Sequence, residues 1–203
     1  MKIGVLGGTF DPPHLGHLRL AEAVRLKLGL DEVLFVPAGV PYLKEGDRAI
    51  TPAEHRVAMV RLAIKDYPHF RLSLTEVERP GPSYTVDTIA ELRKDLKEGD
   101  ELFFILGWDN LLALPGWREP PRLVKLCKLV AMPRAGYPVP DLKALDKVIP
   151  GIALRTTVLF SPVINISATV IRERVARGLS VSQLVPEAVA EYIKKHQLYQ
   201  KID

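Results

Sequence analysis

The chain of 203 residues has very little cysteine, because Cys127 is the only one. A single thiol cannot form an intramolecular disulfide, and it excludes a zinc site built from several cysteines. Long apolar runs are missing too, since none approaches the ~20 residues that a membrane-spanning helix needs. The first residues, MKIGVLGGTF, contain one lysine and a short apolar run, which is typical of a first strand rather than a signal peptide. We therefore expect a cytoplasmic protein that does not enter a membrane.

The chain also lacks a strong excess of charge of either sign. Its 28 Lys and Arg against 24 Asp and Glu give a formal net charge of +4. This weak basic excess suits a protein that handles anions. The basic residues are dispersed and carry no recognised nucleic-acid-binding motif, so we expect no nucleic-acid partner. The length suits a single domain over residues 1–203, and the sequence leaves open whether the chain forms a homo-oligomer.

Strand and helix patterns alternate along the chain. Short apolar runs predict strands at residues 3–6, 33–36, 101–106, 128–132 and 156–160, and an alternating pattern predicts one at 70–74. Helical spacing predicts helices from residue 15 to a stop at Gly29, after Thr51 as N-cap, within 83–96, over 168–177 and from about 186. The proline-containing residues 133–150 indicate a long surface excursion. The alternation predicts an α/β fold with a doubly wound, mainly parallel sheet and two closing C-terminal helices.

In such a sheet, ligands bind beyond the carboxyl ends of the strands. Three expected strand ends carry unusual residues, at 7–17, 107–117 and 161–172. In the first, GGTFDPPHLGH, Gly7 and Gly8 would allow a sharp turn, and the next helix would add its free amides. Neither the Walker A loop nor the dinucleotide-binding G-x-G-x-x-G motif fits this stretch. It therefore predicts a phosphate site of another design.

The two histidines of this stretch, His14 and His17, admit three interpretations. With Asp11 they could hold zinc or iron, although Pro12 and Pro13 mean that the three side chains need not converge. They could simply cap and solvate the start of a helix. They could instead donate two imidazole N–H groups to a phosphate beside the backbone amides. We favour this third interpretation, and predict no metal site in the protein itself.

Four sequence blocks resemble those of one enzyme family. GTFDPPHLGH matches the T/H-x-G-H signature of the adenylyltransferase superfamily of nucleotidyltransferases, and NISATVIRERV is similar to its second signature, I-S-x-T-x-I-R. PSYTVDT and GWDNLLALPGW resemble blocks of bacterial nicotinate-nucleotide adenylyltransferases, in the same order along nearly the whole chain. The resemblance implies a Rossmann-like nucleotidyltransferase fold and an enzyme that makes nicotinate adenine dinucleotide from ATP and nicotinate mononucleotide, in NAD synthesis.

The resemblance also implies how the reaction proceeds. The phosphate of nicotinate mononucleotide attacks the α-phosphorus of ATP, and pyrophosphate leaves. Because a phosphate monoester has a second pKa near ~6, this nucleophile is largely ionised at neutral pH and needs no general base. Catalysis then depends on in-line positioning and on neutralising negative charge. Mg²⁺ would arrive with ATP, held mostly by the substrate and water.

The family's roles carry over to the matching positions of this sequence. His14, His17 and Arg172 would be catalytic, because they would meet the charge on the phosphates. The backbone amides of Tyr84 and Thr85 would bind the nicotinate carboxylate, Trp117 would stack on the pyridine ring, and Asp109 would accept from a ribose hydroxyl. The residues that would bind ATP or its phosphates are Gly7, Gly8, Thr9, Phe10, Lys44, Gly107, Asp109, Ile166, Ser167, Thr169 and Arg172. Taken without the motifs, Ser167 indicates a helix cap and Trp117 a core aromatic.

Two departures from the family pattern concern the shape of the site. Tyr42 and Leu43 replace the usual Pro and His before Lys44, and the bulky Trp108 precedes Asp109, where it could alter the pocket wall. Nicotinamide mononucleotide and phosphopantetheine remain alternative acceptors. A regulatory module that binds nucleotide without catalysis is an alternative of another class.

Overall fold

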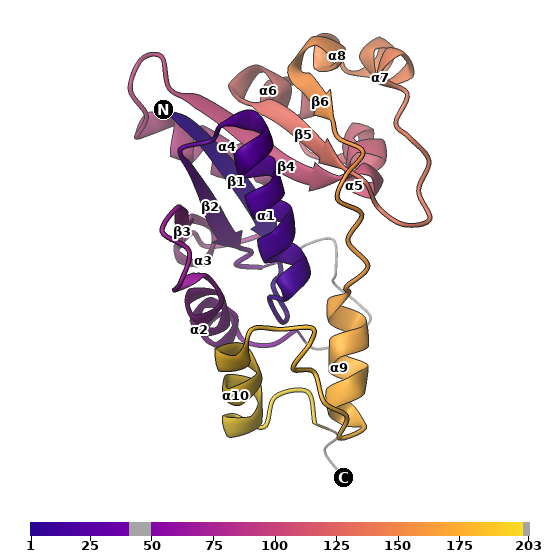
Figure 1. The fold of residues 1–203 in the computed structure, drawn as a ribbon. Coiled ribbons are helices and arrows are strands. Elements are labelled where there is room, and N and C mark those ends of the chain that lie inside the picture. Colours follow the sequence, from indigo (N-terminus) through magenta and orange to yellow (C-terminus); the bar gives the residue numbers. More distant parts are fainter. Residues whose placement is uncertain (41–49, 201–203) are drawn as a thin grey trace.

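The structure, a computed structural model, describes residues 1–40 and 50–200. In this part of the chain six strands form one sheet in the order β3-β2-β1-β4-β5-β6, and each neighbouring pair is parallel. From edge to edge, the strands are β3 (Phe70–Leu72), β2 (Glu32–Pro37), β1 (Lys2–Gly8), β4 (Glu101–Gly107), β5 (Lys128–Met132) and β6 (Thr156–Val158). The predicted α/β fold is thus confirmed (Figure 1).

Helices cover both faces of this sheet. In chain order the described helices are α1 (Leu15–Leu28), α2 (Ala53–Ile64), α3 (Thr75–Glu78), α4 (Thr85–Lys94), α5 (Trp108–Ala113), the 3-10 turn η2 (Leu114–Gly116), α6 (Pro120–Leu126), α7 (Leu142–Val148), α8 (Ile152–Arg155), α9 (Ala168–Ala176) and α10 (Glu187–Lys195). None of those helices is both long and apolar enough to cross a membrane.

The strand residues divide between two cores because successive side chains point to opposite faces of a sheet. In β4, Phe103 and Ile105 belong to the core on the face of α1, α2 and α10. Leu102 and Phe104 belong to the core on the opposite face, with residues of α4, α6 and α8. Because β4 is buried on both faces, its sequence is one continuous apolar run rather than an alternating one.

The strand order places a crevice at the centre of the sheet. From β1 the chain first builds outward through β2 to β3, and it then returns to β4 on the other side of β1. A reversal of this kind leaves a crevice at the carboxyl ends of β1 and β4, which is where doubly wound folds bind their ligands. The residues that follow these two strands belong to the 7–17 and 107–117 stretches.

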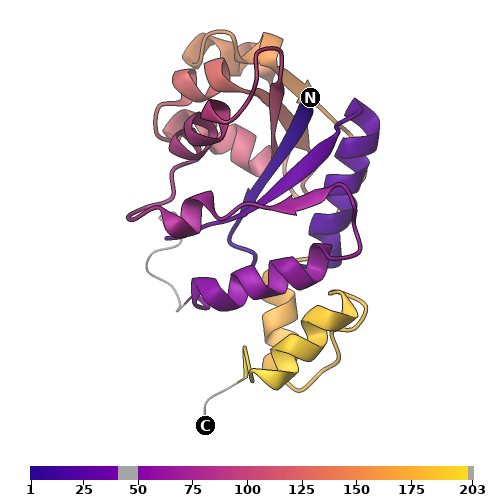
Figure 2. The same cartoon turned by 90° about the vertical axis from the view of Figure 1, so that its left-hand side faces the viewer.

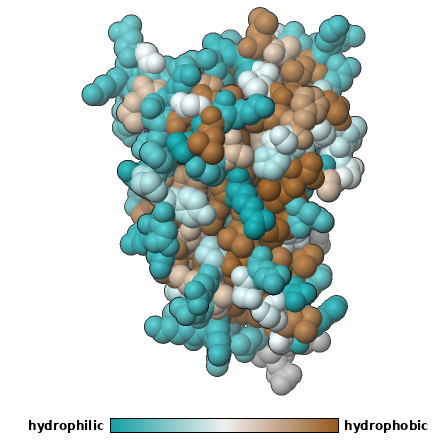
Figure 3. All heavy atoms as spheres, in the orientation of Figure 1, coloured by the Kyte–Doolittle hydropathy of each residue, from teal (hydrophilic) through white to brown (hydrophobic). Residues whose placement is uncertain are grey.

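The two C-terminal helices lie beyond the carboxyl ends of the central strands (Figure 1). Figure 1 shows α9 and α10 below the sheet, on the side toward which β2 points, and Figure 2 shows the same arrangement from the side. A linker over residues 159–167 runs down from β6 to α9. Figure 3 shows hydrophobic residues gathered over β6 and this linker, where Phe160 is 65% and Val163 60% exposed.

Several predicted boundaries are wrong. The third strand ends at Leu72, because the chain turns into the short helix α3 at Thr75. Thr51 does not cap α2, since the N-cap position is Pro52. Within residues 133–150, the expected surface excursion contains the helix α7, which is capped by Asp141 and packs Leu145 into the core. The predicted stop at Gly29 is confirmed, with φ at 61° in the left-handed region.

Candidate active site

A cavity of about 780 Å³ lies at the carboxyl ends of the central strands. Its walls come from β1 and the loop that follows it, from the ends of β4 and β5, and from the first turns of α1, α4, α5 and α9. All the predicted site residues in the described part of the chain line it: Gly7, Gly8, Thr9, Phe10, His14, His17, Tyr84, Thr85, Gly107, Asp109, Trp117, Ile166, Ser167, Thr169 and Arg172. Lys44, Tyr42 and Leu43 lie outside the described residues.

The loop after β1 turns later than expected. Gly7 and Gly8 continue the strand, where they pair with Val36 and Pro37, so the predicted sharp turn at these glycines is wrong. The left-handed residue is Phe10, with φ at 51° and a ring that is only 2% exposed. A Cβ on Gly8 would lie 3.3 Å from the Phe10 ring. Glycine therefore leaves room for this ring rather than bending the strand.

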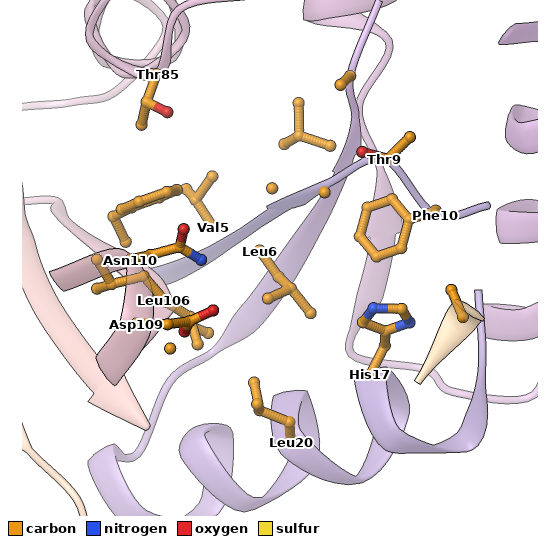
Figure 4. A pocket seen from close by; sticks show the side chains of 18 of the residues that line it. Val5, Leu6, Thr9, Phe10, His17, Leu20, Thr85, Leu106, Asp109 and Asn110 are labelled. Atoms are coloured by element: carbon orange, nitrogen blue, oxygen red, sulfur yellow. The ribbon is translucent and has the colours of Figure 1, made fainter. Parts of the chain in front are cut away.

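His14 and His17 form a stacked pair at the start of α1. His14 is the N-cap residue, and the ring centroids lie 3.6 Å apart at 17°. The His14 backbone N–H donates to Nδ1 of His17 at 3.1 Å. Because that nitrogen accepts, the neutral His17 ring carries its proton on Nε2. In Figure 4, the His17 ring lies below Phe10, on the side of Leu6 opposite to Asp109.

The environment keeps His14 uncharged. Burial, and to a smaller extent the positive charge of Arg134, lower its pKa from 6.5 to about 4. The histidine that caps α1 is therefore neutral at physiological pH when no anion is bound. An anion in the cavity would shift this pKa upward, because an opposite charge favours the charged form.

Gly16 allows the close packing of this corner. A Cβ at this position would lie 2.6 Å from Cγ2 of Ile164, in the linker before α9, and 2.9 Å from Nδ1 of His14. No heavier residue fits without displacing either the linker or the histidine. The glycine of the H-x-G-H stretch thus brings α1 and the linker together at the cavity.

Asp11 does not join the two histidines as a metal ligand. Asp11 is 2% exposed, and its carboxylate accepts from the Tyr199 hydroxyl at 2.7 Å. Among residues 1–40 and 50–200, no three His, Cys, Asp or Glu side chains are grouped so as to hold a metal ion. The geometry of the described stretch therefore does not support the zinc or iron interpretation.

The start of α9 supplies hydroxyl and guanidinium groups to the cavity. Ser167 is the N-cap of this helix, and its hydroxyl accepts from the Val170 backbone N–H at 3.2 Å. Arg172 donates to the Asp11 carbonyl at 2.8 Å and to the Thr169 hydroxyl at 3.1 Å. Ser167 thus both caps α9 and lines the cavity. Arg172 connects α9 to the loop after β1.

The ends of β4 and β5 bring together a carboxylate and a cation. Asp109 lies in the first turn of α5, and a Cβ on Gly107 would collide with its Oδ1. Arg134, two residues after β5, also lines the cavity. Its Nε lies 4.0 Å from Oδ2 of Asp109. The sequence motifs do not include Arg134, although its place directly after a buried strand is a signal that could have found it.

The start of α4 forms the far wall. Tyr84 is its N-cap residue, and the Arg118 guanidinium carbon lies 4.5 Å from the centroid of the Tyr84 ring. Trp117 contacts the Phe104 ring edge-to-face, with 6.2 Å between the centroids. Trp108, by contrast, is 8% exposed and belongs to the core on the α4 face, with the exposed Phe160 ring at its edge, so it does not form the cavity wall.

Arg56 is a further residue that the sequence motifs do not include. It is 2% exposed, and its guanidinium donates to the backbone carbonyls of Thr9, Ala38, Gly39 and Thr51. These bonds join the loop after β1 to the segment after β2. A lone arginine in an amphipathic helix gives no signal of such a role, because most arginines there are exposed.

Comparison with known proteins supports one family. The cytidylyltransferase-like family model matches residues 5–174. A probable nicotinate-nucleotide adenylyltransferase from Dehalococcoides mccartyi is 52% identical, over 98% of this chain and 97% of its own length. A protein of the same name from a Roseiflexus species is 47% identical, over 97% of both chains.

Solved structures agree with the fold. The nicotinic acid mononucleotide adenylyltransferase of Plasmodium falciparum, in complex with NaAD, has a TM-score of 0.75 at 20% identity, covering 98% of this chain and 97% of that one. The same enzyme in complex with APC also gives 0.75, at 19% identity and over 98% and 96% of the two chains. The long matches at high identity, on top of this shared fold, show that the chain belongs to the cytidylyltransferase-like family of nucleotidyltransferases and, within it, to the nicotinate-nucleotide adenylyltransferases.

Proposed function

We propose that the protein transfers the adenylyl group of ATP to nicotinate mononucleotide, giving nicotinate adenine dinucleotide and pyrophosphate, a step of NAD synthesis. The observation that carries this proposal is the convergence of three helix starts on one cavity. The first turns of α1, α4 and α9 each bring backbone amides or donor side chains to the walls. A substrate pair with phosphates at its centre and a carboxylate at one end matches this arrangement.

The triphosphate would lie between α1 and α9. Helix starts attract anions through their first amides and their partial positive charge. We assign the phosphate contacts to Nε2–H of His17, to the hydroxyls of Ser167 and Thr169, and to Arg172. His14 would approach the same phosphates and take up a proton as they bind, since its pKa is low in the free cavity. Lys44 is assigned to this role on the sequence match alone.

The adenosine and the mononucleotide would occupy opposite walls. Asp109 suits a ribose hydroxyl, because a carboxylate accepts hydrogen bonds strongly. On the far wall, the first amides of α4 near Tyr84 and Thr85 suit the nicotinate carboxylate, and Trp117 offers an aromatic face to the pyridine ring. Arg118 lies over the Tyr84 ring at this end, with its guanidinium carbon 4.5 Å from the ring centroid, but the carboxylates of Asp87 at 3.9 Å and Glu119 at 3.8 Å balance its charge. The preference for an acid over an amide therefore rests on the helix amides.

The reaction needs little more than these contacts. A phosphate oxygen of the mononucleotide forms a bond to the α-phosphorus while the bond from that phosphorus to the bridging oxygen breaks, and pyrophosphate leaves with the electron pair. The attacking phosphate is ionised at neutral pH, so no base is assigned. Arg172 and the N–H donors stabilise the charge on the transferred group in the transition state.

A divalent cation would come with the substrate rather than from the protein. The described residues offer no group of three His, Cys, Asp or Glu side chains that could hold a metal ion. Magnesium bound to the triphosphate oxygens would neutralise part of their charge. We derive no step of the reaction through it.

The decisive experiment offers Mg·ATP with each of three acceptors: nicotinate mononucleotide, nicotinamide mononucleotide and phosphopantetheine. Pyrophosphate and the adenylylated product are measured for each. We expect the highest kcat/KM with nicotinate mononucleotide. Preference for another acceptor would reassign the substrate, and binding of ATP without pyrophosphate release would indicate a regulatory module instead.

A further inference from the structure

The C-terminal end of the described chain reaches the loop of the histidines. The Tyr199 hydroxyl donates to the Asp11 carboxylate at 2.7 Å, across a separation of 188 residues. Tyr199 lies after α10 in the left-handed region, with φ at 63°, and its ring packs against the core on the α1 face. An unfavourable backbone conformation at a tyrosine is retained only where the surroundings hold it in place. The surrounding structure therefore holds Tyr199 in place for its contact with Asp11.

Asp11 is a buried charge that requires such a partner. The residue is 2% exposed, and burial of a carboxylate is costly unless hydrogen bonds and opposite charges compensate. Tyr199 supplies a hydrogen bond, and the buried guanidinium of Arg56 attracts Asp11 electrostatically. Burial and the negative charge of Asp11 raise the pKa of Tyr199 above its usual range, so the hydroxyl stays protonated and remains a donor.

Asp11 is also connected to both groups of residues that we assign to the phosphates. Along the chain it is three residues before His14, which caps α1 and stacks on His17. Through its carbonyl it accepts from Arg172 of α9. A shift of Asp11 would therefore move the histidine pair and the arginine relative to one another.

We propose that Tyr199 is a positioning residue, which acts through the Asp11 carboxylate to hold the histidine loop and Arg172 in register for adenylyl transfer. This inference rests on the proposed function, since it assigns Tyr199 a part in the same reaction. It differs from a purely structural role, because removal of the hydroxyl should affect the transition state more than the binding of ATP. Misplacement of groups by about 1 Å can cost roughly a hundredfold in rate.

The test compares Tyr199→Phe with Tyr192→Phe. Both changes remove one tyrosine hydroxyl from the C-terminal segment, and the Tyr192 hydroxyl bonds to His55, at 2.9 Å, rather than to the histidine loop. For Y199F we expect kcat to fall roughly tenfold to a hundredfold, with KM for ATP within about twofold of the parent. For Y192F we expect kcat and KM to stay at the parent values.

A double-mutant cycle with Asp11→Ala identifies the route of the effect. If Tyr199 acts through Asp11, Y199F lowers kcat no further once the carboxylate is gone, because coupled residues are not additive. Equal losses in both backgrounds would overturn the proposal. So would a Y199F protein that keeps the parent kcat but unfolds at a lower temperature, or one that fails to fold while Y192F folds, since either result makes the role structural.

The parent protein separates failure of this inference from failure of the proposed function. Its turnover of Mg·ATP with nicotinate mononucleotide is measured first in the same assay. No turnover by the parent would contradict the proposed function. Parent turnover together with an unaffected Y199F would contradict the positioning role alone.

Discussion

His17 provides the most direct test of the proposed chemistry at the scale of single residues. Its Nδ1 accepts from the His14 backbone, which leaves Nε2–H as its donor. Removal of one donor to a transition state costs roughly two orders of magnitude in rate. We therefore expect His17→Ala to lower kcat by about that factor, with a folded protein and a smaller change in KM. Steady-state kinetics check this prediction, and a change confined to KM would show that His17 binds the ground state instead.

A second prediction concerns His14 and the pH dependence of the free energy of unfolding. Its folded pKa of about 4 lies below the ordinary 6.5, so the unfolded chain binds this proton more readily than the folded one. The free energy of unfolding should therefore fall as the pH drops from 6.5 to 4, by an amount on the order of 3 kcal/mol from this residue alone. His14→Asn should flatten that part of the profile.

Urea denaturation of the two proteins at several pH values measures this difference. The comparison is made without ATP or phosphate in the buffer, since an anion in the cavity would raise the pKa of His14. Parallel profiles for parent and H14N between pH 4 and 6.5 would contradict the assigned burial. His17→Ala is not a suitable control, because its ring stacks on His14.

At the scale of elements, the N-cap of α9 combines stability and binding. Ser167 caps this helix through the Val170 amide and also lines the cavity. Asp141 caps α7 through the amides of Lys143 and Ala144. Loss of either cap by alanine should cost about 1 kcal/mol of stability. We expect Ser167→Ala to raise KM for ATP as well, whereas Asp141→Ala should leave the kinetics unchanged.

Thermal unfolding and steady-state kinetics on both variants test this distinction. A loss of stability in S167A with no change in KM for ATP would restrict Ser167 to its capping role. A kinetic change in D141A would mean that the cap of α7 affects the cavity through the core. The two caps thus act as controls for each other.

The strands were predictable because each lies in a short apolar or alternating run, and the helix starts at the cavity were predictable because their residues match known blocks. The prolines within 133–150 indicate irregular structure. The helix α7 has only seven residues, which is too short for its apolar spacing to outweigh that signal. The N-cap at Thr51 was wrong because the helix starts one residue later, after Pro52. End positions of this kind depend on tertiary contacts that the local pattern does not contain.

At the scale of the whole molecule, ATP should stabilise the fold. The cavity joins β1, β4, α1 and α9, so a ligand bound there holds together elements from both halves of the chain. A ligand at 100 times its Kd stabilises by about 2.7 kcal/mol. For a chain of this length we expect an increase in Tm of roughly 5–10 °C.

Differential scanning fluorimetry with Mg·ATP measures this increase, with Mg²⁺ alone as the control. Arg172→Ala should show a smaller shift, because it removes a cation from the α9 side of the cavity. A parent Tm that does not change at ATP concentrations that saturate turnover would contradict the placement of ATP in this cavity.

The residues that could not be predicted from the sequence share one property. Arg56 and Tyr199 reach the cavity region from positions that only the folded chain brings near the motifs. The motif residues were found because they lie together in sequence blocks, at the strand ends where a parallel sheet collects its ligands. Partners contributed from distant segments carry no local pattern. Tertiary structure is the first level at which they can be recognised.

The hydrogen bond between Asp11 and Tyr199 has a consequence for the synthesis of the protein. A ribosome makes the tyrosine that anchors Asp11 188 residues after Asp11 itself. Until Tyr199 has been made, the Asp11 carboxylate therefore lacks the hydrogen bond that this tyrosine donates. Chains released early would carry every sequence motif of the enzyme and still lack the last contact of its loop. In this protein, the histidine loop therefore gains its full set of contacts only after the segment that follows α10 has been made.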